Sequence, residues 1–326
     1  MSDGFSPPLG IGLVGVGRHG SRYLQHLLGD LPGAALAALC RRTAGKRLPG
    51  CEVPLYGDYR AMIADPKVEA VVVVTPPTLC LDICLAATSA GKPILIEKPL
   101  ATSGADARAM VAAADRARVP LMTAQTLRFD PAILLLKEQL RTIGRLQSAT
   151  LVSHIETKAN MLPGTATPVP LGALLELGVH LLDLVRFLTG EEIAEVRCSM
   201  APAGGPETVA TVRLRTTGGL ACTLDIARVE SQRVGTAEWI GSAGTVTADW
   251  PGRTVTTCLT GGASDRRTVE PRPTVLAALQ AFVHAIRTGT PPPVTGLDGC
   301  RAVEAADACY RSASLGGAAV SPADAG

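Results

Sequence analysis

Aromatic side chains, an excess of charge of one sign and long hydrophobic runs are all scarce in this sequence. Only ten of the 326 residues are aromatic (four Phe, four Tyr and two Trp), too few for a surface that stacks single-stranded bases. The 31 basic side chains nearly balance the 29 acidic ones, which leaves a formal net charge of +2. We therefore expect neither nucleic acid nor an anionic membrane as a partner.

Membrane, targeting and metal-binding signals are missing as well. No apolar run approaches the length of about 18 residues that a bilayer span needs, and the start MSDGFSPPLG lacks the features of a signal peptide. Cys80 and Cys84 are four residues apart, but no second pair completes a zinc site, so we expect no metal. The nine cysteines form no CxxC pair. An odd number of such thiols suits a reducing compartment, and we predict a cytoplasmic protein.

The chain divides into two regions with different patterns. Over residues 1–127, short apolar strands alternate with helical stretches, which is typical of a parallel sheet with crossover helices. The run VEAVVVV, which ends at Thr75, is nearly all apolar, as a strand covered on both faces must be. Six such strands predict an N-terminal α/β domain, a doubly wound Rossmann fold that binds NAD(P).

The second region, residues 128–326, has fewer helices and more strands. Segments between 192 and 259 alternate apolar and polar residues and are separated by short turns, which indicates an antiparallel sheet. With helices before and after it, this region predicts an α+β domain with a large, mostly antiparallel open sheet. We expect this domain to bind substrate and to form homodimer or homotetramer contacts through the open face.

The sequence GVGRHG, residues 15–20, follows the first predicted strand and begins a helix. In that place Gly15 would allow a tight turn, Gly17 the close approach of a diphosphate, and Gly20 close packing of helix on strand. The helix N-terminus favours negative charge. We therefore expect the whole turn to bind the cofactor diphosphate: Gly15, Gly17, Arg18, His19 and Gly20.

The second predicted strand ends in Cys40-Arg41-Arg42-Thr43, where an NAD enzyme usually has an acidic residue for the ribose 2′-hydroxyl. Arginine can instead bind a 2′-phosphate through a forked, charge-assisted contact. The sequence predicts a preference for NADP(H), with NAD(H) as a possible second cofactor. Arg41 is the main expected contact, supported by Arg42 or Thr43.

Two further motifs follow predicted strands. Thr75 and Pro76 end the fourth strand, and Glu97 and Lys98 end the fifth. Because the carboxyl ends of parallel strands line the ligand crevice, we expect these residues beside the cofactor. Lys98 comes directly after a buried strand, an unusual place for a solubilising cation.

The helix predicted over 172–188 combines apolar and ionisable residues. At about 100° per residue, one narrow stripe holds Glu176, His180, Asp183 and Phe187, and the rest is apolar apart from Arg186. Ionisable groups on a buried helix are costly unless they face a polar site. A lone histidine is most often a core residue, but one that shares its stripe with two carboxylates suits proton transfer.

Taken together, these motifs resemble the glucose-fructose oxidoreductase and inositol dehydrogenase family (Gfo/Idh/MocA). The resemblance runs from about Ile11 to Val320 and rests on GVGRHG, TPP, AGKPILIEKPLA, RFDP, LGALLELGVHLLDLVRFLTG, WIGSAGTV and AFVHAIRTGTPPPVTGLDG. It implies a Rossmann domain followed by an α/β domain with a large open sheet. That sheet often makes dimer or tetramer contacts in the family.

The resemblance also implies roles for single residues. Lys98 matches the lysine that contacts the substrate oxygen beside the nicotinamide, and His180 matches the usual proton acceptor or donor. Glu176 stands where the family usually has aspartate, and Asp183 matches the acid that follows the histidine. Cys80 replaces a histidine that many relatives have, which leaves the contacts there open.

The function expected from the sequence is reversible hydride transfer between nicotinamide and a carbinol or carbonyl carbon of a sugar, cyclitol or related polyol. His180 would move the hydroxyl proton and Lys98 would stabilise the developing alkoxide. Glu176 and Asp183 would orient the imidazole or bind neighbouring hydroxyls. Two alternatives remain open: a hydrolase that retains NAD, and a dinucleotide-binding sensor without catalysis.

Overall fold

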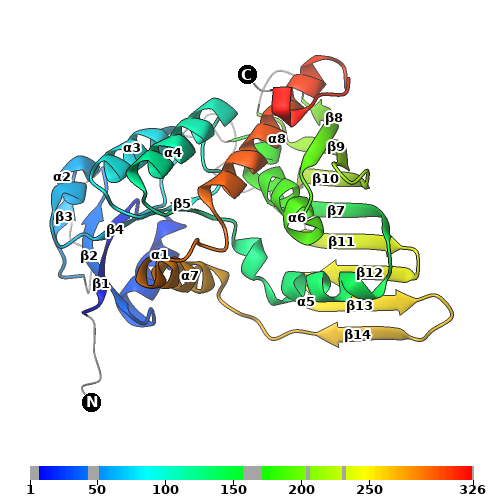
Figure 1. Ribbon diagram of the computed structural model, residues 1–326, viewed down its shortest axis with the longest axis horizontal. Coiled ribbons are helices and arrows are strands. Elements are labelled where there is room, and N and C mark those ends of the chain that lie inside the picture. Colours follow the sequence, from blue (N-terminus) through cyan, green and yellow to red (C-terminus); the bar gives the residue numbers. More distant parts are fainter. Residues whose placement is uncertain (1–6, 43–50, 157–170, 203–205, 230–232, 325–326) are drawn as a thin grey trace. The chain divides into compact units, whose positions relative to one another are not determined.

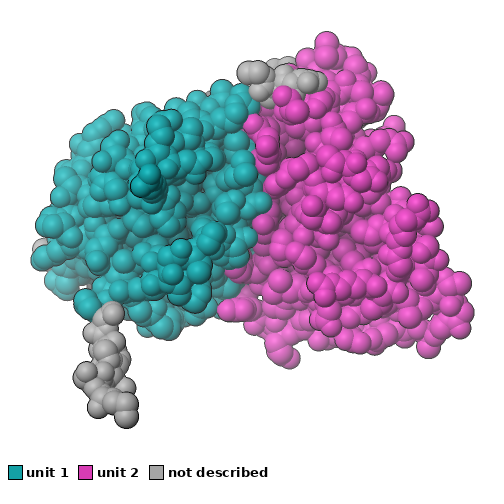
Figure 2. All heavy atoms as spheres, in the orientation of Figure 1, with its two compact units in different colours: residues 1–126, 273–300 teal, residues 127–272, 301–326 magenta. Residues whose placement is uncertain are grey.

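The computed structural model of the chain describes residues 7–42, 51–156, 171–202, 206–229 and 233–324. Two compact units make up the chain (Figure 2): Met1–Thr126 with Pro273–Cys300, and Leu127–Arg272 with Arg301–Gly326. This division differs from the expected 1–127 and 128–326, because residues 273–300 return to the first unit. Helix α7 (Thr274–Thr288) contacts α1 (Gly20–Gly29), and Arg287 Nη2 donates a hydrogen bond to the Gly33 carbonyl (3.1 Å).

The first unit is built on a six-stranded sheet with the order β3-β2-β1-β4-β5-β6, all parallel. Its strands are β1 (Leu9–Val14), β2 (Ala34–Cys40), β3 (Leu55–Tyr56), β4 (Ala70–Val73), β5 (Ile94–Glu97) and β6 (Leu121–Ala124). Every residue of β1, β4, β5 and β6 is buried, as expected for strands covered on both faces. This order confirms the predicted Rossmann fold.

Helices cover both faces of this sheet (Figure 1). One face carries α2 (Tyr59–Ala64), α3 (Cys80–Ser89) and α4 (Gly104–Ala117), and the other carries α1 and α7. Side-chain caps fix where two of them begin. Asp58 Oδ1 accepts a hydrogen bond from the Arg60 amide (2.9 Å), and Ser103 Oγ accepts one from the Asp106 amide (3.1 Å).

The second unit is built on an eight-stranded sheet with the order β14-β13-β12-β11-β7-β10-β9-β8. Its strands are β7 (Leu146–Glu156), β8 (Ile193–Ala201), β9 (Val209–Thr216), β10 (Ala221–Val229), β11 (Val234–Gly241), β12 (Gly244–Asp249), β13 (Thr254–Leu259) and β14 (Ser264–Thr268). Only the β7–β10 pair is parallel among these strands. The large, mostly antiparallel sheet is therefore confirmed.

Helices α5 (Pro131–Gln139) and α6 (Val179–Thr189) pack on one face of the second sheet, and the part of α8 (Gly296–Ser314) from residue 301 onward adds buried residues to the same core. Their apolar side chains join those of the strands in one core that includes Leu151, Leu182 and the fully buried Trp239. Buried and more exposed residues alternate along β9 and β11, so the other face of the sheet is open.

Two elements of the second unit differ from the expectation. Residues 174–178 form a π turn rather than the first part of one α-helix, and the Val179 amide donates to the Leu174 carbonyl five residues earlier. Strand β14 was not expected, because all five of its residues are exposed and they show no apolar alternation. It pairs with β13 through its backbone.

The described part of the chain shows neither a membrane-spanning helix nor a metal cluster. No helix there combines the length and the apolar character needed to cross a bilayer. Within the same residues, no group of three or more His, Cys, Asp and Glu side chains is placed to hold a metal ion.

Candidate active site

The strand order of the first sheet reverses at one point, between β1 and β4. Strand β1 lies between β2 and β4, and successive connections leave β1 and β4 in opposite directions along the sheet. In open α/β sheets, ligands bind at the carboxyl ends of the strands at such a point. Residues that directly follow β1, β2, β4 and β5 are therefore the candidates for cofactor contacts.

In the glycine turn after β1, an added Cβ would clash with backbone atoms at two of the three glycines and would meet open space at the third. Gly15 has φ +93°, and a Cβ there would lie 2.2 Å from the Val74 carbonyl oxygen. A Cβ on Gly20 would lie 2.1 Å from the Gly15 oxygen, so only glycine lets the helix approach the strand. A Cβ on Gly17 would meet nothing within 4 Å. The space in front of Gly17 is where a diphosphate would approach the backbone, so the turn fits a dinucleotide.

Arg18 and His19 are exposed within the same turn, and His19 reaches the motif that follows β5. His19 Nε2 lies 2.6 Å from Glu97 Oε1, and the Tyr23 hydroxyl donates to the same oxygen (2.6 Å). The Lys98 amide donates to the other oxygen, Oε2 (2.9 Å). Glu97 thus connects the glycine turn to the backbone of Lys98.

Charge balance explains how Glu97 stays ionised although it is only 8% exposed. Burial by itself raises the pKa of a carboxyl group, but here the opposing effects prevail. The hydrogen bond and charge of His19, the charge of Lys98 and the Tyr23 hydroxyl together hold the pKa of Glu97 below its ordinary value. Burial and the nearby Glu97 charge raise the pKa of Tyr23 well above normal, so its hydroxyl remains a donor.

Lys98 and Thr75 follow neighbouring strands, since β5 pairs with β4. Lys98 is partly buried and is joined to Pro99 by a cis peptide bond. Thr75 Oγ1 lies 3.8 Å from Cys80 Sγ in the first turn of α3, and Pro76 is exposed beside it. Burial raises the pKa of Cys80 to about 12, so this thiol stays protonated.

Arg41 follows directly from the strand beside the glycine turn. Val14 of β1 is paired with Cys40 of β2, and the Gly15 amide donates to the Cys40 carbonyl (2.9 Å). Arg41 is partly exposed, and its Nε is buried without a hydrogen-bond partner among the described residues. Arg42 is exposed, and Thr43 lies outside the described residues.

In the second unit, the π turn and α6 carry the predicted catalytic stripe. Glu176 lies in the π turn, and His180 lies in the first turn of α6. Both side chains are partly buried, whereas Asp183 is fully buried. Leu181, Leu182, Leu184 and Val185 are also buried, which agrees with the mostly buried helix expected from its apolar circumference.

Asp183 and Phe187 both contact Arg128, which lies just before α5. Asp183 Oδ2 accepts from Arg128 Nε (2.7 Å) and Oδ1 accepts from Nη2 (2.5 Å). Such a bidentate pair is strong and directional. The Arg128 guanidinium lies 5.1 Å from the centre of the Phe187 ring, and Lys137 Nζ lies 3.6 Å from it. These contacts anchor α6 in its unit.

Glu176 pairs with a different arginine. Its Oε2 accepts a hydrogen bond from Nη2 of Arg228, near the end of β10. The two acids of the predicted stripe thus bind arginines from separate elements, Arg128 and Arg228. Lys98 belongs to the first unit and His180 to the second, so their convergence on one nicotinamide remains a proposal.

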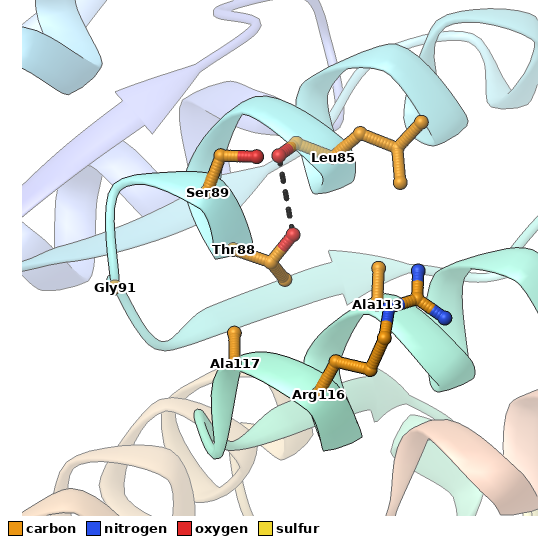
Figure 3. A pocket seen from close by; sticks show the side chains of 7 residues that line it. All are labelled: Leu85, Thr88, Ser89, Gly91, Ala113, Arg116 and Ala117. Carbon is orange, nitrogen blue, oxygen red and sulfur yellow. Dashed lines mark hydrogen bonds between the residues drawn. The ribbon is translucent and has the colours of Figure 1, made fainter.

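One pocket in the described structure lies away from these residues (Figure 3). It has a volume of about 470 Å³ and is lined by Leu85, Thr88, Ser89, Gly91, Ala113, Arg116 and Ala117. These residues end α3 and α4 or follow α3, so they lie at the amino edge of the sheet, opposite the glycine turn. The Thr88 hydroxyl donates to the Leu85 carbonyl (3.1 Å). The pocket therefore takes no part in the candidate site.

Sequence patterns did not identify four residues that support the site: Tyr23, Arg128, Glu207 and Arg228. Tyr23 and Arg128 lie close to recognised motifs, in α1 and in RFDP, which offered some signal. Glu207 lies just before β9 and Arg228 near the end of β10, and nothing in the sequence around them distinguishes a buried charge from a solvated one. Their contacts come from residues far away in the chain.

Comparisons with known proteins agree with this geometry. Residues 9–125 match the family model described as an oxidoreductase family with an NAD-binding Rossmann fold, and residues 141–247 match the GFO/IDH/MocA C-terminal domain. The chain is 30% identical over 322 residues to inositol 2-dehydrogenase 1 of Saccharopolyspora erythraea, covering 93% of both proteins. It is 30% identical over 315 residues to myo-inositol 2-dehydrogenase of Thermotoga maritima, covering 89% of this chain and 91% of that one.

A similar solved structure is the aldose-aldose oxidoreductase from Caulobacter crescentus complexed with glycerol. Its TM-score is 0.84 at 26% identity, with 96% of this chain and 99% of that chain covered. The family match, the two full-length relatives and the shared architecture agree with one another. The chain is thus an enzyme of the Gfo/Idh/MocA oxidoreductase family, with an NAD-binding Rossmann fold in its first unit.

Proposed function

We propose that this enzyme is a dehydrogenase that transfers hydride between NADP(H) and a carbinol or carbonyl carbon of a sugar, cyclitol or related polyol. The main observation behind the proposal is the open space in front of Gly17, at the carboxyl edge of the sheet. Gly15 and Gly20, on either side of it in the chain, pack directly against backbone atoms. The names of the two inositol dehydrogenases support a polyol as the substrate.

The preference for NADP(H) is argued from the end of β2. Arg41 follows the residue that is hydrogen bonded to Gly15, and its buried Nε has no partner among the described residues. A 2′-phosphate would supply the missing acceptor and an opposite charge. Arg42 and Thr43 are proposed as supporting contacts, and NAD(H) as a weaker cofactor.

A cofactor-exchange experiment tests this preference. Arg41→Ser should weaken NADP+ binding about tenfold or more, because a charge-assisted hydrogen bond contributes about 1.5–3 kcal/mol. NAD+ binding should stay the same. Arg116→Ser, which removes an exposed arginine from α4, is the matched control. Equal losses for both cofactors would contradict the assignment of Arg41 to the 2′-phosphate.

For the chemical step, we propose that Lys98 and His180 act on the same substrate oxygen. When bound, the nicotinamide would supply or accept the hydride. Lys98 would stabilise negative charge on the oxygen with its ammonium group, and His180 would accept the hydroxyl proton during oxidation and return it during reduction. Glu176 would orient the imidazole or bind a neighbouring hydroxyl, and Asp183 would support α6 from its pair with Arg128.

The decisive experiment combines a substrate screen with two variants. Wild-type protein should reduce NADP+ with at least one sugar or cyclitol. His180→Gln should lower kcat about 10²- to 10⁴-fold, the usual contribution of a general base, while NADP+ still binds. Lys98→Met should lower kcat as well. Full turnover in the His180 variant would remove the histidine from the mechanism.

The same assay distinguishes the proposed dehydrogenase from a hydrolase that retains NAD. Such an enzyme would cleave a glycoside without net change in nicotinamide absorbance, and its cofactor would stay bound through purification. A sensor would bind the dinucleotide and turn over none of these substrates.

We further propose that the enzyme is a cytoplasmic homodimer or homotetramer. The open face of the eight-stranded sheet supports the assembly, because such a face is commonly covered by a second subunit. Nine free cysteines, eight of them buried, support a reducing compartment. Sedimentation would measure the subunit number, and a monomer at micromolar concentration would contradict the assembly.

A further inference from the structure

Two side chains from outside the helix hold the segment that leads into α6. Arg228 Nη2 donates to the Leu171 carbonyl and to the Glu176 carboxylate, so it binds both sides of the start of the π turn. Glu207 accepts from the Leu174 amide (2.8 Å) and from the Tyr310 hydroxyl (3.0 Å). The Glu207 carbonyl also accepts from the Ala173 amide (2.8 Å). We call Arg228 and Glu207 the clamp.

Both members of the clamp are buried charged groups. The Arg228 side chain is 5% exposed and Glu207 is 3% exposed. A buried charge is costly unless it is paired and hydrogen bonded. Their hydrogen bonds to the π turn and the residues before it therefore offset the free-energy cost of burying these two charges.

Two glycines, Gly172 and Gly178, pack closely around the clamp. A Cβ on Gly172 would lie 2.0 and 2.1 Å from the two Glu207 carboxylate oxygens, so only glycine lets this carboxylate reach the Leu174 amide. A Cβ on Gly178 would lie 2.6 Å from Leu174 Cδ1 and 3.0 Å from Cδ1 of Ile226, which is two residues before Arg228 on the same face of β10. Strand β10 thus contacts the π turn at Glu176, through Arg228, and beside Gly178, through Ile226.

A π turn is rare, and it persists only where surrounding contacts stabilise it. Here it contains Glu176 and ends two residues before His180, the proposed proton acceptor. The direction in which Glu176 and His180 point depends on the extra residue in this turn. Loss of the clamp would allow the turn to relax toward an ordinary α-helix.

We propose that Arg228 is a positioning residue that fixes the Glu176 carboxylate and, with Glu207, maintains the π turn that orients His180. This inference rests on the proposed function for its catalytic part, while the clamp itself is a property of the fold. Arg228 acts through Glu176, so its effect on turnover should depend on which residue occupies position 176.

The clamp is tested first without substrate, by hydrogen exchange of the full chain. Arg228→Met should reduce the protection of backbone amides in residues 174–180 about tenfold, because the turn loses two hydrogen bonds. The matched control is Arg186→Met on α6, which breaks the more exposed pair of Arg186 with Glu192, a residue beyond the end of that helix, and should leave these amides unchanged. Unchanged exchange in the Arg228 variant would overturn the clamp.

Kinetics then test the positioning role. Arg228→Met should lower kcat/KM for the polyol at least tenfold with the Kd for NADP+ unchanged within twofold. Arg228→Lys should recover part of the loss, since an ammonium keeps the charge but not the forked geometry. In a Glu176→Gln background, Arg228→Met should have little further effect, because the two residues act as a unit. Full additivity of the two substitutions would overturn the positioning role.

A second variant keeps the test decisive if Arg228→Met does not fold. Glu176→Asp leaves the arginine in place but shortens the side chain by one methylene, so the carboxylate no longer reaches Nη2. It should lose kcat/KM to a similar extent, and an unchanged kcat/KM would count against the proposal. If wild-type protein oxidises no polyol, the proposed function fails, and hydrogen exchange still decides the clamp.

Discussion

Replacing Gly17 by alanine separates cofactor binding from folding. The added Cβ meets nothing within 4 Å, and Gly17 is not among the glycines with positive φ. Alanine therefore fits the folded backbone without strain. Because alanine has less freedom than glycine in the unfolded chain, we expect Gly17→Ala to stabilise the protein by about 0.4–1 kcal/mol.

The same methyl group would occupy the space needed by the diphosphate. If it displaces one charge-assisted hydrogen bond worth about 1.5–3 kcal/mol, the Kd for NADP(H) should rise about 10- to 150-fold. Titration of NADPH fluorescence would measure the Kd, and thermal unfolding would measure stability. The expected signature is weaker binding in a protein that melts no lower than wild type.

Two other glycines in the same region serve as comparisons. Gly29→Ala, at the far end of α1, also adds a Cβ with nothing within 4 Å, so it should stabilise the protein by a similar amount but leave the Kd for NADPH unchanged. Gly20→Ala would place a Cβ 2.1 Å from the Gly15 carbonyl oxygen, so it should lower the melting temperature. Wild-type NADPH affinity in the Gly17 variant would refute the assignment of this turn to the diphosphate.

Three further predictions concern other residues. Asp183→Asn leaves Arg128 buried without its charged partner and should destabilise the second unit by about 3–5 kcal/mol in urea unfolding, whereas Glu192→Gln in an exposed pair should cost about 0–1 kcal/mol; equal effects would contradict the reasoning. The pKa of Glu97 is lower in the folded protein than in the unfolded chain, where it is about 4.3. Ionised Glu97 therefore stabilises the folded protein above that pH, and the stabilisation is lost as the pH falls through the pKa of the folded protein. The melting temperature of Glu97→Gln should accordingly depend less on pH in the acid range than that of the wild type. The same acid dependence in both proteins would argue against the stabilising role of Glu97. Iodoacetamide should modify exposed Cys258 first and leave Cys80 and Cys84 unmodified, since burial raises the pKa of both to about 12; mass spectrometry would identify the modified thiols.

The Rossmann unit could be predicted from local sequence because each of its signals is local. A run such as Ala70–Val73 needs burial on both faces whatever the rest of the chain does, and Gly15 and Gly20 are needed where backbone atoms approach closely. Six strands and the position of the glycine turn followed from these patterns. The return of residues 273–300 to the first unit did not, because α7 has an amphipathic pattern that would pack on either unit.

The second unit was predicted less completely, for reasons that lie in particular residues. Strand β14 consists of Ser264–Thr268, which is exposed throughout and forms a strand through backbone pairing with β13 alone. The π turn at Leu174–Gly178 follows apolar spacing that an α-helix would share. Its geometry depends on Arg228 and Glu207, which contact it across the unit.

By itself, the sequence determined the family, the parallel sheet, the glycine turn and which ionisable residues are candidates for the active site. The tertiary structure decided which partner each of these residues has: His19 and Tyr23 for Glu97, Arg128 for Asp183, and Arg228 for Glu176. The physical reason is the distance along the chain over which each interaction acts. Strand burial and glycine turns depend on neighbours along the chain, whereas a buried charge is paired with groups that are brought to it only when distant elements pack.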